Sequence, residues 1–177
     1  MADLNADKLF FLDEMGVGLN LSPLYGRAPL GQRVYDEQPV AKGKRISMIA
    51  ALSTEGIETA LNFEGTLNGT LFLYFLRHFL CPLLSKGDTV VIDNASPHRV
   101  AEVRETIEAT GARLVYLPPY HPDLNPIELA WNKIKQYLRK QRPRTAEDLY
   151  DAYAKALEDI TKRDAGRFFK HAMSFLS

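Results

Sequence analysis

Thr89-Val90-Val91-Ile92-Asp93 is the stretch that decides the fold, and it is a continuous apolar, β-branched run that ends in an acid. Such a run is typical of a strand covered on both faces of a sheet. Ser96-Pro97 then predict an N-cap and first helical turn, opening a helix that ends near Thr110 at Gly111. Residues 113–117 predict the next strand. A strand, a helix and a second strand in this order indicate a parallel βαβ unit.

The region before this unit predicts further strands. Residues 8–13 form a short apolar run that also ends in an acid. Residues 45–52 and 58–63 predict two strands joined in a hairpin, and the Gly- and Pro-rich residues 17–45 suggest turns around one or two short strands. The order of elements therefore predicts an α/β domain. Its mixed five-stranded sheet has an antiparallel meander on one side, βαβ crossovers on the other, and flanking helices.

Four helices outside the βαβ unit complete the prediction. A helix over 68–84 shows an apolar stripe at helical spacing. Asn125 caps the next helix, with Pro126 at its first position and Glu128 three residues after the cap, and that helix runs to about Gln141. Thr145 caps a third helix, and a last one covers 164–176. The predicted buried residues of the helix over 68–84 are Phe72, Leu73, Phe75, Leu76, Phe79, Leu80 and Leu83. Those of the helix that Thr145 caps are Leu149, Tyr153, Ala156, Leu157 and Ile160.

Composition narrows the class of protein. The chain has 177 residues, with 22 Lys and Arg against 22 Asp and Glu, which excludes a histone-like basic binder and an acidic disordered tail. Its one cysteine, Cys81, excludes an internal disulfide and a zinc site built on several cysteines. The most apolar run, residues 71–76, is far shorter than the roughly 20 residues of a membrane span. We expect a single domain over 1–177, with a core over about 8–141 and C-terminal helices over 145–176, in a reducing cytoplasm and without a membrane partner.

Three acids stand at the ends of predicted elements. Asp13 and Asp93 each close a strand, and Glu128 lies in the first turn of the helix after the next strand. Ligands of open α/β sheets bind beyond the carboxyl ends of the strands, so the three carboxylates could converge there. Clustered carboxylates repel unless a hard cation such as Mg²⁺ neutralises them. Each acid also has a simpler interpretation as a turn or capping residue, but the three together favour a metal site for phosphoryl transfer.

The segments around these acids resemble the catalytic motifs of the DDE transposases. The motifs are Phe11-Leu12-Asp13-Glu14, the run from Val90 to His98, and the run from Leu117 to Glu128. The closest branch is the mariner-like group with its bacterial insertion-sequence relatives, in which 34 residues separate the second and third acids, as here. The resemblance extends over about 8–141, and Tyr25–Gly31 is similar to the family's turn after the first strand.

The resemblance implies a ribonuclease-H-like fold, also used by retroviral integrases. It implies that Asp13, Asp93 and Glu128 hold two Mg²⁺ ions, or Mn²⁺ as a substitute. The implied reaction is cleavage at transposon ends followed by attack of the freed 3′ hydroxyl on target DNA, with a preference for TA targets, in a homodimer or larger assembly. Family members usually carry N-terminal helix-turn-helix modules. Only 12 residues precede Asp13, so we expect that module to be absent here. The chain then corresponds to the second product of a split reading frame with a separate DNA-recognition polypeptide, to a truncated copy, or to an isolated part of a longer protein. The expected location is the bacterial cytoplasm or nucleoid.

The helix that begins near Glu128 is rich in cations. Residues 129–146 contain six Lys and Arg and no acid. At helical spacing, Ile127, Trp131, Ile134 and Leu138 form a core face, and Glu128 shares the neighbouring face with Asn132, Lys135 and Arg139. We therefore predict phosphate contacts, although a solvated surface explains the same pattern. The predicted DNA-binding residues are Asn132, Lys133, Lys135, Arg139 and Lys140, and the possible accessory site residues are Asn94, His98 and His121.

Two other functions compete with a transposase catalytic domain. One is a DNA-binding or assembly module that kept the fold without independent catalysis. The other is a structure-specific nuclease of the same fold, acting on branched DNA or RNA–DNA hybrids. The intact set of three acids argues against the first, and the family-like gap between Asp93 and Glu128 argues against the second.

Overall fold

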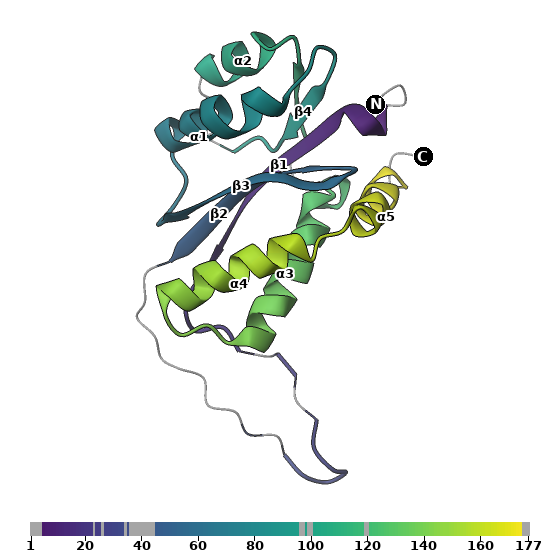
Figure 1. Cartoon of the computed structure of the whole chain (residues 1–177). Helices are drawn as coiled ribbons and strands as arrows, with labels where there is room; N and C mark the ends of the chain where they lie inside the picture. Colours follow the sequence, from purple (N-terminus) through teal and green to yellow (C-terminus); the bar gives the residue numbers. More distant parts are fainter. Residues whose placement is uncertain are drawn as a thin grey trace.

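The centre of the molecule is a five-stranded mixed sheet with strand order β3-β2-β1-β4-β5 (Figure 1). The computed structural model describes residues 5–22, 24–25, 27–33, 35, 45–95, 98, 101–118 and 121–174. Two antiparallel pairings join β1 to β2 and β2 to β3, and two parallel pairings join β1 to β4 and β4 to β5, so the predicted mixed sheet is confirmed. The strands are β1 (Leu9–Val17), β2 (Ile46–Ser53), β3 (Gly56–Glu64), β4 (Thr89–Ile92) and β5 (Arg113–Tyr116).

Helices cover both faces of this sheet (Figure 1). Phe10 and Leu12 of β1 pack in a core with α1 (Gly69–Phe75) and α2 (Ala101–Glu108). Phe11 and Met15 pack in the opposite core, which the three C-terminal helices close. Successive side chains of a strand point to opposite faces, so Asp13 belongs to the same face as Phe11 and Met15. The three helices on that face are α3 (Ile127–Gln141), α4 (Ala146–Glu158) and α5 (Lys162–Met173).

The parallel register between β1 and β4 sets the relative position of the two aspartates. Leu9, Phe10 and Phe11 pair with Thr89, Val90 and Val91. Continuing that register by two residues brings Asp13 level with Asp93, which directly follows β4. Asp13 and Asp93 therefore lie at one level of the sheet. The predicted end of the first strand at Asp13 is wrong, because β1 continues to Val17 by pairing with β2, whereas Asp93 directly follows β4 as predicted.

The helix predicted over 68–84 is correct at its start and wrong at its end. The side chain of Asn68 caps α1 by accepting a hydrogen bond from the Leu71 N–H. After Phe75 the chain changes to a π-helical turn (Leu76–Leu80) and a 3₁₀ turn (Cys81–Leu83). The wider turn rotates the following residues away from the apolar stripe, so Leu83 is 44% exposed and does not belong to the core.

The predicted capping box of α3 is also wrong. The N-cap is Pro126, whose side chain has no atom that can accept a hydrogen bond. The Oδ1 atom of the buried Asn125 has no hydrogen-bond partner among the described residues. The N–H groups of Glu128 and Leu129 bond to the backbone carbonyls of Asn125 and Pro126 instead. Glu128 is therefore free of a capping role and remains available for the site.

The other predicted helix boundaries have mixed outcomes. Thr145 caps α4 in a capping box with Asp148, and all predicted α4 core residues except the half-buried Leu157 are buried. The last helix spans Lys162–Met173 and not 164–176, because Thr161 caps it through Asp164. The predicted cap at Ser96-Pro97 lies outside the described residues.

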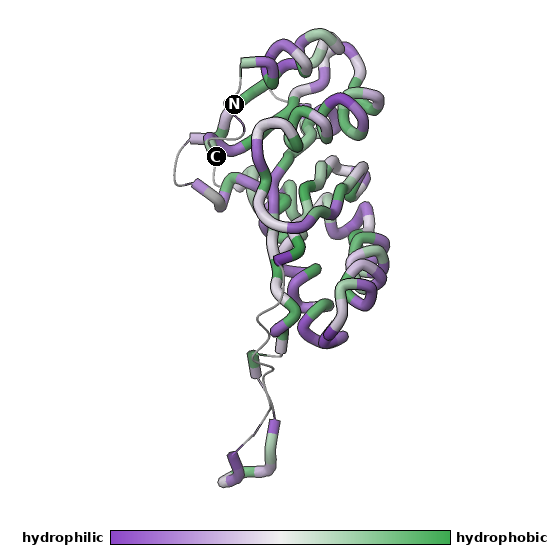
Figure 2. Tube along the Cα trace, turned by 90° about the vertical axis from the view of Figure 1, so that its left-hand side faces the viewer, coloured by the Kyte–Doolittle hydropathy of each residue, from purple (hydrophilic) through white to green (hydrophobic). Residues whose placement is uncertain are grey.

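Residues 27–33, between β1 and β2, lie away from the sheet (Figures 1 and 2). The described residues between Val17 and Ile46 form no strand, so the predicted short strands are absent from that part of the chain. Leu24, Tyr25, Leu30 and Tyr35 are all exposed. Among the helices of the described ranges, none has the length and apolar character needed to cross a membrane.

Candidate active site

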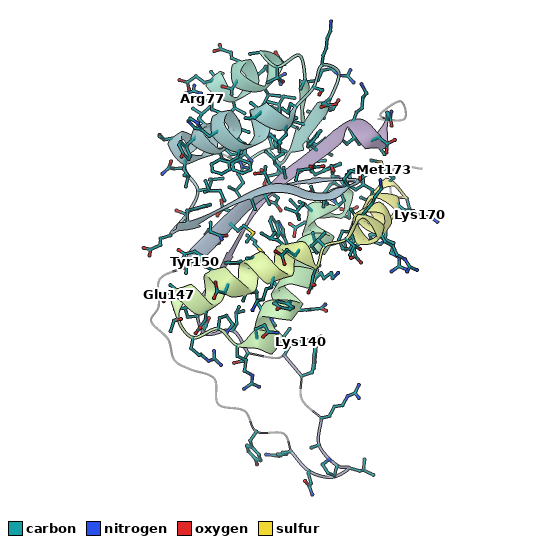
Figure 3. The ribbon with its side chains drawn as sticks, in the orientation of Figure 1. Arg77, Lys140, Glu147, Tyr150, Lys170 and Met173 are labelled. Atoms are coloured by element: carbon teal, nitrogen blue, oxygen red, sulfur yellow. The ribbon has the colours of Figure 1, made fainter. Side chains whose placement is uncertain are left out.

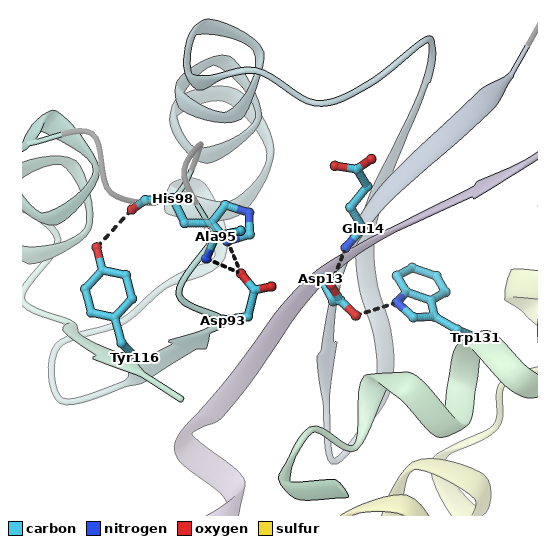
Figure 4. Close-up of polar contacts among 7 residues, drawn as sticks. All are labelled: Asp13, Glu14, Asp93, Ala95, His98, Tyr116 and Trp131. Carbon is cyan, nitrogen blue, oxygen red and sulfur yellow. Dashed lines mark hydrogen bonds and ion pairs between the residues drawn. The ribbon is translucent and has the colours of Figure 1, made fainter. Parts of the chain in front are cut away.

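Asp13 and Asp93 face each other across neighbouring strands at the centre of the candidate site (Figure 4). Asp13 is in the middle of β1, where apolar residues on both sides hold its backbone in the sheet. Asp93 is the first residue after β4, whose four residues are all buried. Both carboxylates therefore project from a rigid platform.

The Asp13 carboxylate is hydrogen-bonded at both oxygens. Its Oδ1 accepts from the backbone N–H of Glu14 at 2.7 Å, and its Oδ2 accepts from the indole Nε1 of Trp131 at 3.1 Å. Burial, followed by the nearby carboxylates of Glu128 and Asp93, raises the pKa of Asp13 to about 7. Both hydrogen bonds oppose this rise, because they stabilise the charged form. Asp13 is thus poised between its protonated and ionised forms near neutral pH.

Asp93 lies in a different environment. Its Oδ1 accepts hydrogen bonds from the backbone N–H of Ala95, at 3.0 Å, and from the ring Nδ1 of His98. The hydrogen bond from His98 lowers the pKa of Asp93 below its ordinary value, against the opposing effect of burial. The Asp93 side chain is 47% exposed. The site therefore pairs an ionised acid with one that readily holds a proton.

His98, predicted as a possible accessory residue, is in direct contact with Asp93. Because an ionised carboxylate only accepts hydrogen bonds, the Nδ1 of His98 carries the proton of this bond. The imidazole lies against the Phe72 ring of α1, with centroids 4.4 Å apart. The backbone carbonyl of His98 accepts a hydrogen bond from the hydroxyl of Tyr116, at the end of β5, at 2.9 Å.

Glu128 approaches the aspartates from the first turn of α3. Its charge raises the pKa of Asp13 more than the charge of Asp93 does, which places its carboxylate within electrostatic reach. Glu128 also lines an open pocket of about 310 Å³. The other residues of this pocket are Asp123, Asn125, Leu129, Asn132 and His171.

The donor set fits a hard divalent cation. The charges of Glu128 and Asp93 raise the pKa of Asp13, so a neutralising positive charge would favour the ionised site, and carboxylate oxygens are the ligands that Mg²⁺ and Mn²⁺ prefer. In the described ranges, however, no three acid, His or Cys groups stand close enough to enclose one ion. Asp13 and Asp93 lie on neighbouring strands, and Glu128 lies on a separate element, in the first turn of α3.

The predicted DNA-binding residues of α3 differ in their surroundings. The ammonium of Lys133 bonds to the Asp164 carboxylate of α5, at 2.8 Å, and to the Asp159 carbonyl. Arg139 and Lys140 line an open surface pocket of about 270 Å³ with Leu24 and Tyr25. The core face predicted for this helix is confirmed, since Ile127, Trp131, Ile134 and Leu138 are all buried.

Three other predicted residues have simple placements. Asn132 is exposed beside Glu128, and Asn94, next to Asp93, is half-buried. The ring of the exposed His121 is 3.9 Å from the carboxylate of Asp123, which lines the Glu128 pocket.

Sequence reasoning missed two residues of the site. The sequence predicts Trp131 only as a core residue, yet its indole N–H donates a hydrogen bond to Asp13. The signal was available, because Trp131 is three residues after Glu128, and such residues are neighbours on a helix surface. His171 reaches the Glu128 pocket from α5, and only the packing of α5 on α3 brings it there.

A family model described as DDE superfamily endonuclease matches residues 8–150 of the chain. The fold is similar to that of a Mos1 mariner paired-end complex with Mn, with a TM-score of 0.80 and 17% identity over 98% of this chain and 54% of that one. The Mos1 transposase catalytic domain matches with a TM-score of 0.71 and 14% identity, over 96% and 78% of the two chains. A search of the curated proteins found no match.

These similarities confirm the ribonuclease-H-like fold predicted from the three motifs. A Mos1 paired-end complex with the left transposon end gives a TM-score of 0.77 at 17% identity, over 96% of this chain and 53% of that one. The chain thus spans about half the length of the Mos1 chains in the paired-end complexes.

Proposed function

Since the chain belongs to the DDE superfamily endonucleases, we propose that it is a transposase catalytic domain of an insertion sequence. In this proposal it cleaves DNA strands at transposon ends and transfers the freed 3′ end to target DNA, in a Mg²⁺-dependent reaction. The observation that carries the proposal is the position of Asp13 and Asp93 at one level of two neighbouring strands, with the charge of Glu128 acting on Asp13.

Asp13, Asp93 and Glu128 would hold two Mg²⁺ ions, or Mn²⁺ as a substitute. When bound, these ions would supply positive charge at the attacking and leaving oxygens of the scissile phosphodiester. The contribution of the chain itself is placement. The hydrogen bond from His98 favours the ionised form of Asp93, and Asp13, whose pKa is about 7, would hold a metal ion in its ionised form.

DNA would approach along the cationic side of α3. Lys135, Arg139 and Lys140 would contact phosphates, and Asn132 would do so beside Glu128. Such contacts hold DNA in register without reading its bases. Lys133 remains a predicted contact, although its ammonium is already bonded to Asp164 of α5.

The proposed partners are two transposon ends and a target DNA, with TA as the expected target site, in a homodimer or larger assembly. Two of the similar Mos1 structures are paired-end complexes, and this supports an assembly of the same kind here. A separate N-terminal DNA-recognition polypeptide would select the ends. The proposed location is the bacterial cytoplasm or nucleoid.

Nicking of labelled DNA in Mg²⁺, Mn²⁺ or Ca²⁺ tests the proposal. We expect cleavage with Mg²⁺ and Mn²⁺, and binding without efficient chemistry in Ca²⁺. Asp93→Ala and Glu128→Gln should each lower the rate of cleavage by about 100-fold or more, because each removes a proposed metal ligand while the fold stays intact. Glu147→Gln, which removes an exposed acid of α4, is the matched control and should cleave as the parent does.

The same assay separates the two competing functions. Retained DNA binding without cleavage in any metal would indicate an assembly module. Cleavage of branched DNA or RNA–DNA hybrids, without joining of a 3′ end to a second duplex, would indicate a structure-specific nuclease. Cleavage at the parent rate by Asp93→Ala or Glu128→Gln would contradict the assignment of these residues as metal ligands.

A further inference from the structure

Each of the two facing aspartates accepts a hydrogen bond from a buried aromatic N–H that lies outside the set of three acids. We propose that Trp131 and His98 are positioning residues, which hold the carboxylates of Asp13 and Asp93 in the orientation that binds divalent metal. The inference rests on the proposed function and adds to it a second layer of residues. It assigns these side chains a role in metal affinity, separate from their role in core packing.

The contact at Asp13 restricts rotation of the carboxylate. Trp131 is 1% exposed, and its indole N–H can only donate, so its position in the core fixes one end of the bond. The Glu14 N–H holds the other oxygen. With one donor on each oxygen, the carboxylate cannot turn about its Cβ–Cγ bond without breaking both hydrogen bonds. Each oxygen keeps a further lone pair for a cation.

The contact at Asp93 is arranged differently. The Ala95 N–H and the His98 Nδ1 both donate to Oδ1. The second carboxylate oxygen points toward the side of Asp13 in Figure 4. Holding one oxygen from behind presents the other to the space between the two strands, where a shared cation would lie.

His98 is itself held on two sides. Its side chain is almost fully buried, and the residue is 3% exposed. The Phe72 ring of α1 supports the imidazole, and the Tyr116 hydroxyl of β5 holds the backbone carbonyl. A residue buried only for packing does not need its polar atom directed at an ionised carboxylate. The geometry is that of a partner that orients a metal ligand.

These hydrogen bonds counteract the repulsion within the site. The Trp131 N–H donates to one oxygen of Asp13 and the His98 Nδ1 to one oxygen of Asp93, so each carboxylate is held in place against the repulsion of the neighbouring acids. Loss of either donor should therefore weaken metal binding even where the fold survives. In known metal sites, loss of such a partner typically costs about 10–100-fold in affinity.

The experiment measures Mn²⁺ affinity of the whole chain without DNA, by electron paramagnetic resonance of the free ion, with melting curves to verify folding. His98→Phe keeps a ring against Phe72 but removes the donor. His98→Asn loses the ring but places an amide N–H where Nδ1 was. We expect His98→Phe and Trp131→Phe to weaken Mn²⁺ binding about tenfold or more, and His98→Asn to stay within about threefold of the parent.

Tyr153→Phe is the matched control. It removes a buried aromatic hydrogen bond, from the Tyr153 hydroxyl to the Ile46 carbonyl, at the end of β2 opposite Val17 and away from Asp13. We expect its Mn²⁺ affinity to equal that of the parent. If a His98 variant fails to fold, Tyr116→Phe provides the second measure, since it frees only the carbonyl of His98 and should weaken Mn²⁺ binding about threefold.

The order of the two His98 variants decides between the explanations. A packing role predicts that His98→Phe binds Mn²⁺ better than His98→Asn, and this result would overturn the inference. Parent-like affinity in both His98→Phe and Trp131→Phe would also overturn it, while leaving the proposed function intact. A parent chain that binds no Mn²⁺ at all would instead contradict the proposed function, and the inference with it.

Discussion

At the scale of single residues, the site is defined by two aspartates with opposite proton affinities. Asp13 is buried beside two other carboxylates and its pKa is raised to about 7, whereas His98 holds the pKa of Asp93 below its ordinary value. The difference follows from surroundings, since both residues end or interrupt similar apolar strands. Metal binding should therefore compete with a proton mainly at Asp13.

The raised pKa of Asp13 predicts how stability depends on pH without metal. Its folded-state pKa exceeds the ordinary 3.8, so between about pH 4 and 7 the folded protein binds more protons than the unfolded chain. The free energy of unfolding then falls as pH rises through this window. Without metal, we expect the free energy of unfolding of the parent to fall by about 2 kcal/mol between pH 5 and 8, or roughly 4–8 °C in Tm. Asp13→Asn should not show this fall in melting curves.

The control for this prediction is Asp151→Asn, an exposed acid of α4, which should keep the pH dependence of the parent. Mn²⁺ should restore the stability of the parent at pH 8 and leave that of Asp13→Asn unchanged. Identical pH dependence in the parent and Asp13→Asn would show that Asp13 ionises normally.

At the scale of elements, α3 connects the site to the C-terminal helices. Its first turn carries Glu128, its buried face carries Trp131, and the Lys133 side chain binds α5. The Asp164 carboxylate that receives Lys133 also closes the capping box of α5, and the hydrogen bond from Lys133 lowers the pKa of Asp164 to about 2. The docking of α5 in turn places His171 beside Glu128.

Lys133→Met tests whether this lysine serves the fold or the DNA. We expect the free energy of unfolding to fall by about 1 kcal/mol, or roughly 2–4 °C in Tm. The effect is modest because the ion pair is partly exposed. Hydrogen exchange should quicken in α5 and stay unchanged in α2. Arg104→Met, which breaks an exposed ion pair with Glu108 within α2, is the control and should shift Tm by less. Weaker DNA binding with normal exchange in α5 would instead support the predicted phosphate contact.

At the scale of the whole molecule, charge is segregated although the net charge is zero. Figure 3 shows Lys140 near the end of α3, Lys170 on α5 and Glu147 at the start of α4. Because the net charge is zero, the chain as a whole is not attracted to DNA over a long range, so binding must depend on where cations gather. The acidic residues of α4 are Glu147, Asp148, Asp151 and Glu158, and the cations of α5 are Lys162, Arg163, Arg167 and Lys170.

The salt dependence of DNA binding tests this distribution. Lys135→Ala and Arg139→Ala should each weaken binding and reduce the slope of log K against log salt by about one, the value for one lost phosphate contact. Binding is measured by fluorescence anisotropy at several salt concentrations in Ca²⁺. Lys155→Ala removes a cation from the acidic helix α4 and should leave the slope unchanged. A parent-like slope in both α3 variants would place the DNA elsewhere on the molecule.

The sequence by itself determined the sheet, its mixed pairing and the three acids. The apolar runs before Asp13 and Asp93 and the cap at Thr145 are local signals, because burial on both faces of a strand and unsatisfied helix N–H groups constrain neighbouring residues directly. The family-like motifs then indicated the fold that the comparisons confirm.

Only the tertiary structure decided what surrounds those acids. Three features depend on packing that no local pattern encodes. They are the π-turn that exposes Leu83, the helix start at which the Oδ1 of Asn125 has no hydrogen-bond partner among the described residues, and the bond from Trp131 to Asp13. The same holds for the opposite pKa shifts of Asp13 and Asp93. Proton affinity depends on burial and on charges brought from distant parts of the chain, and these distances exist only once the helices have packed on the sheet.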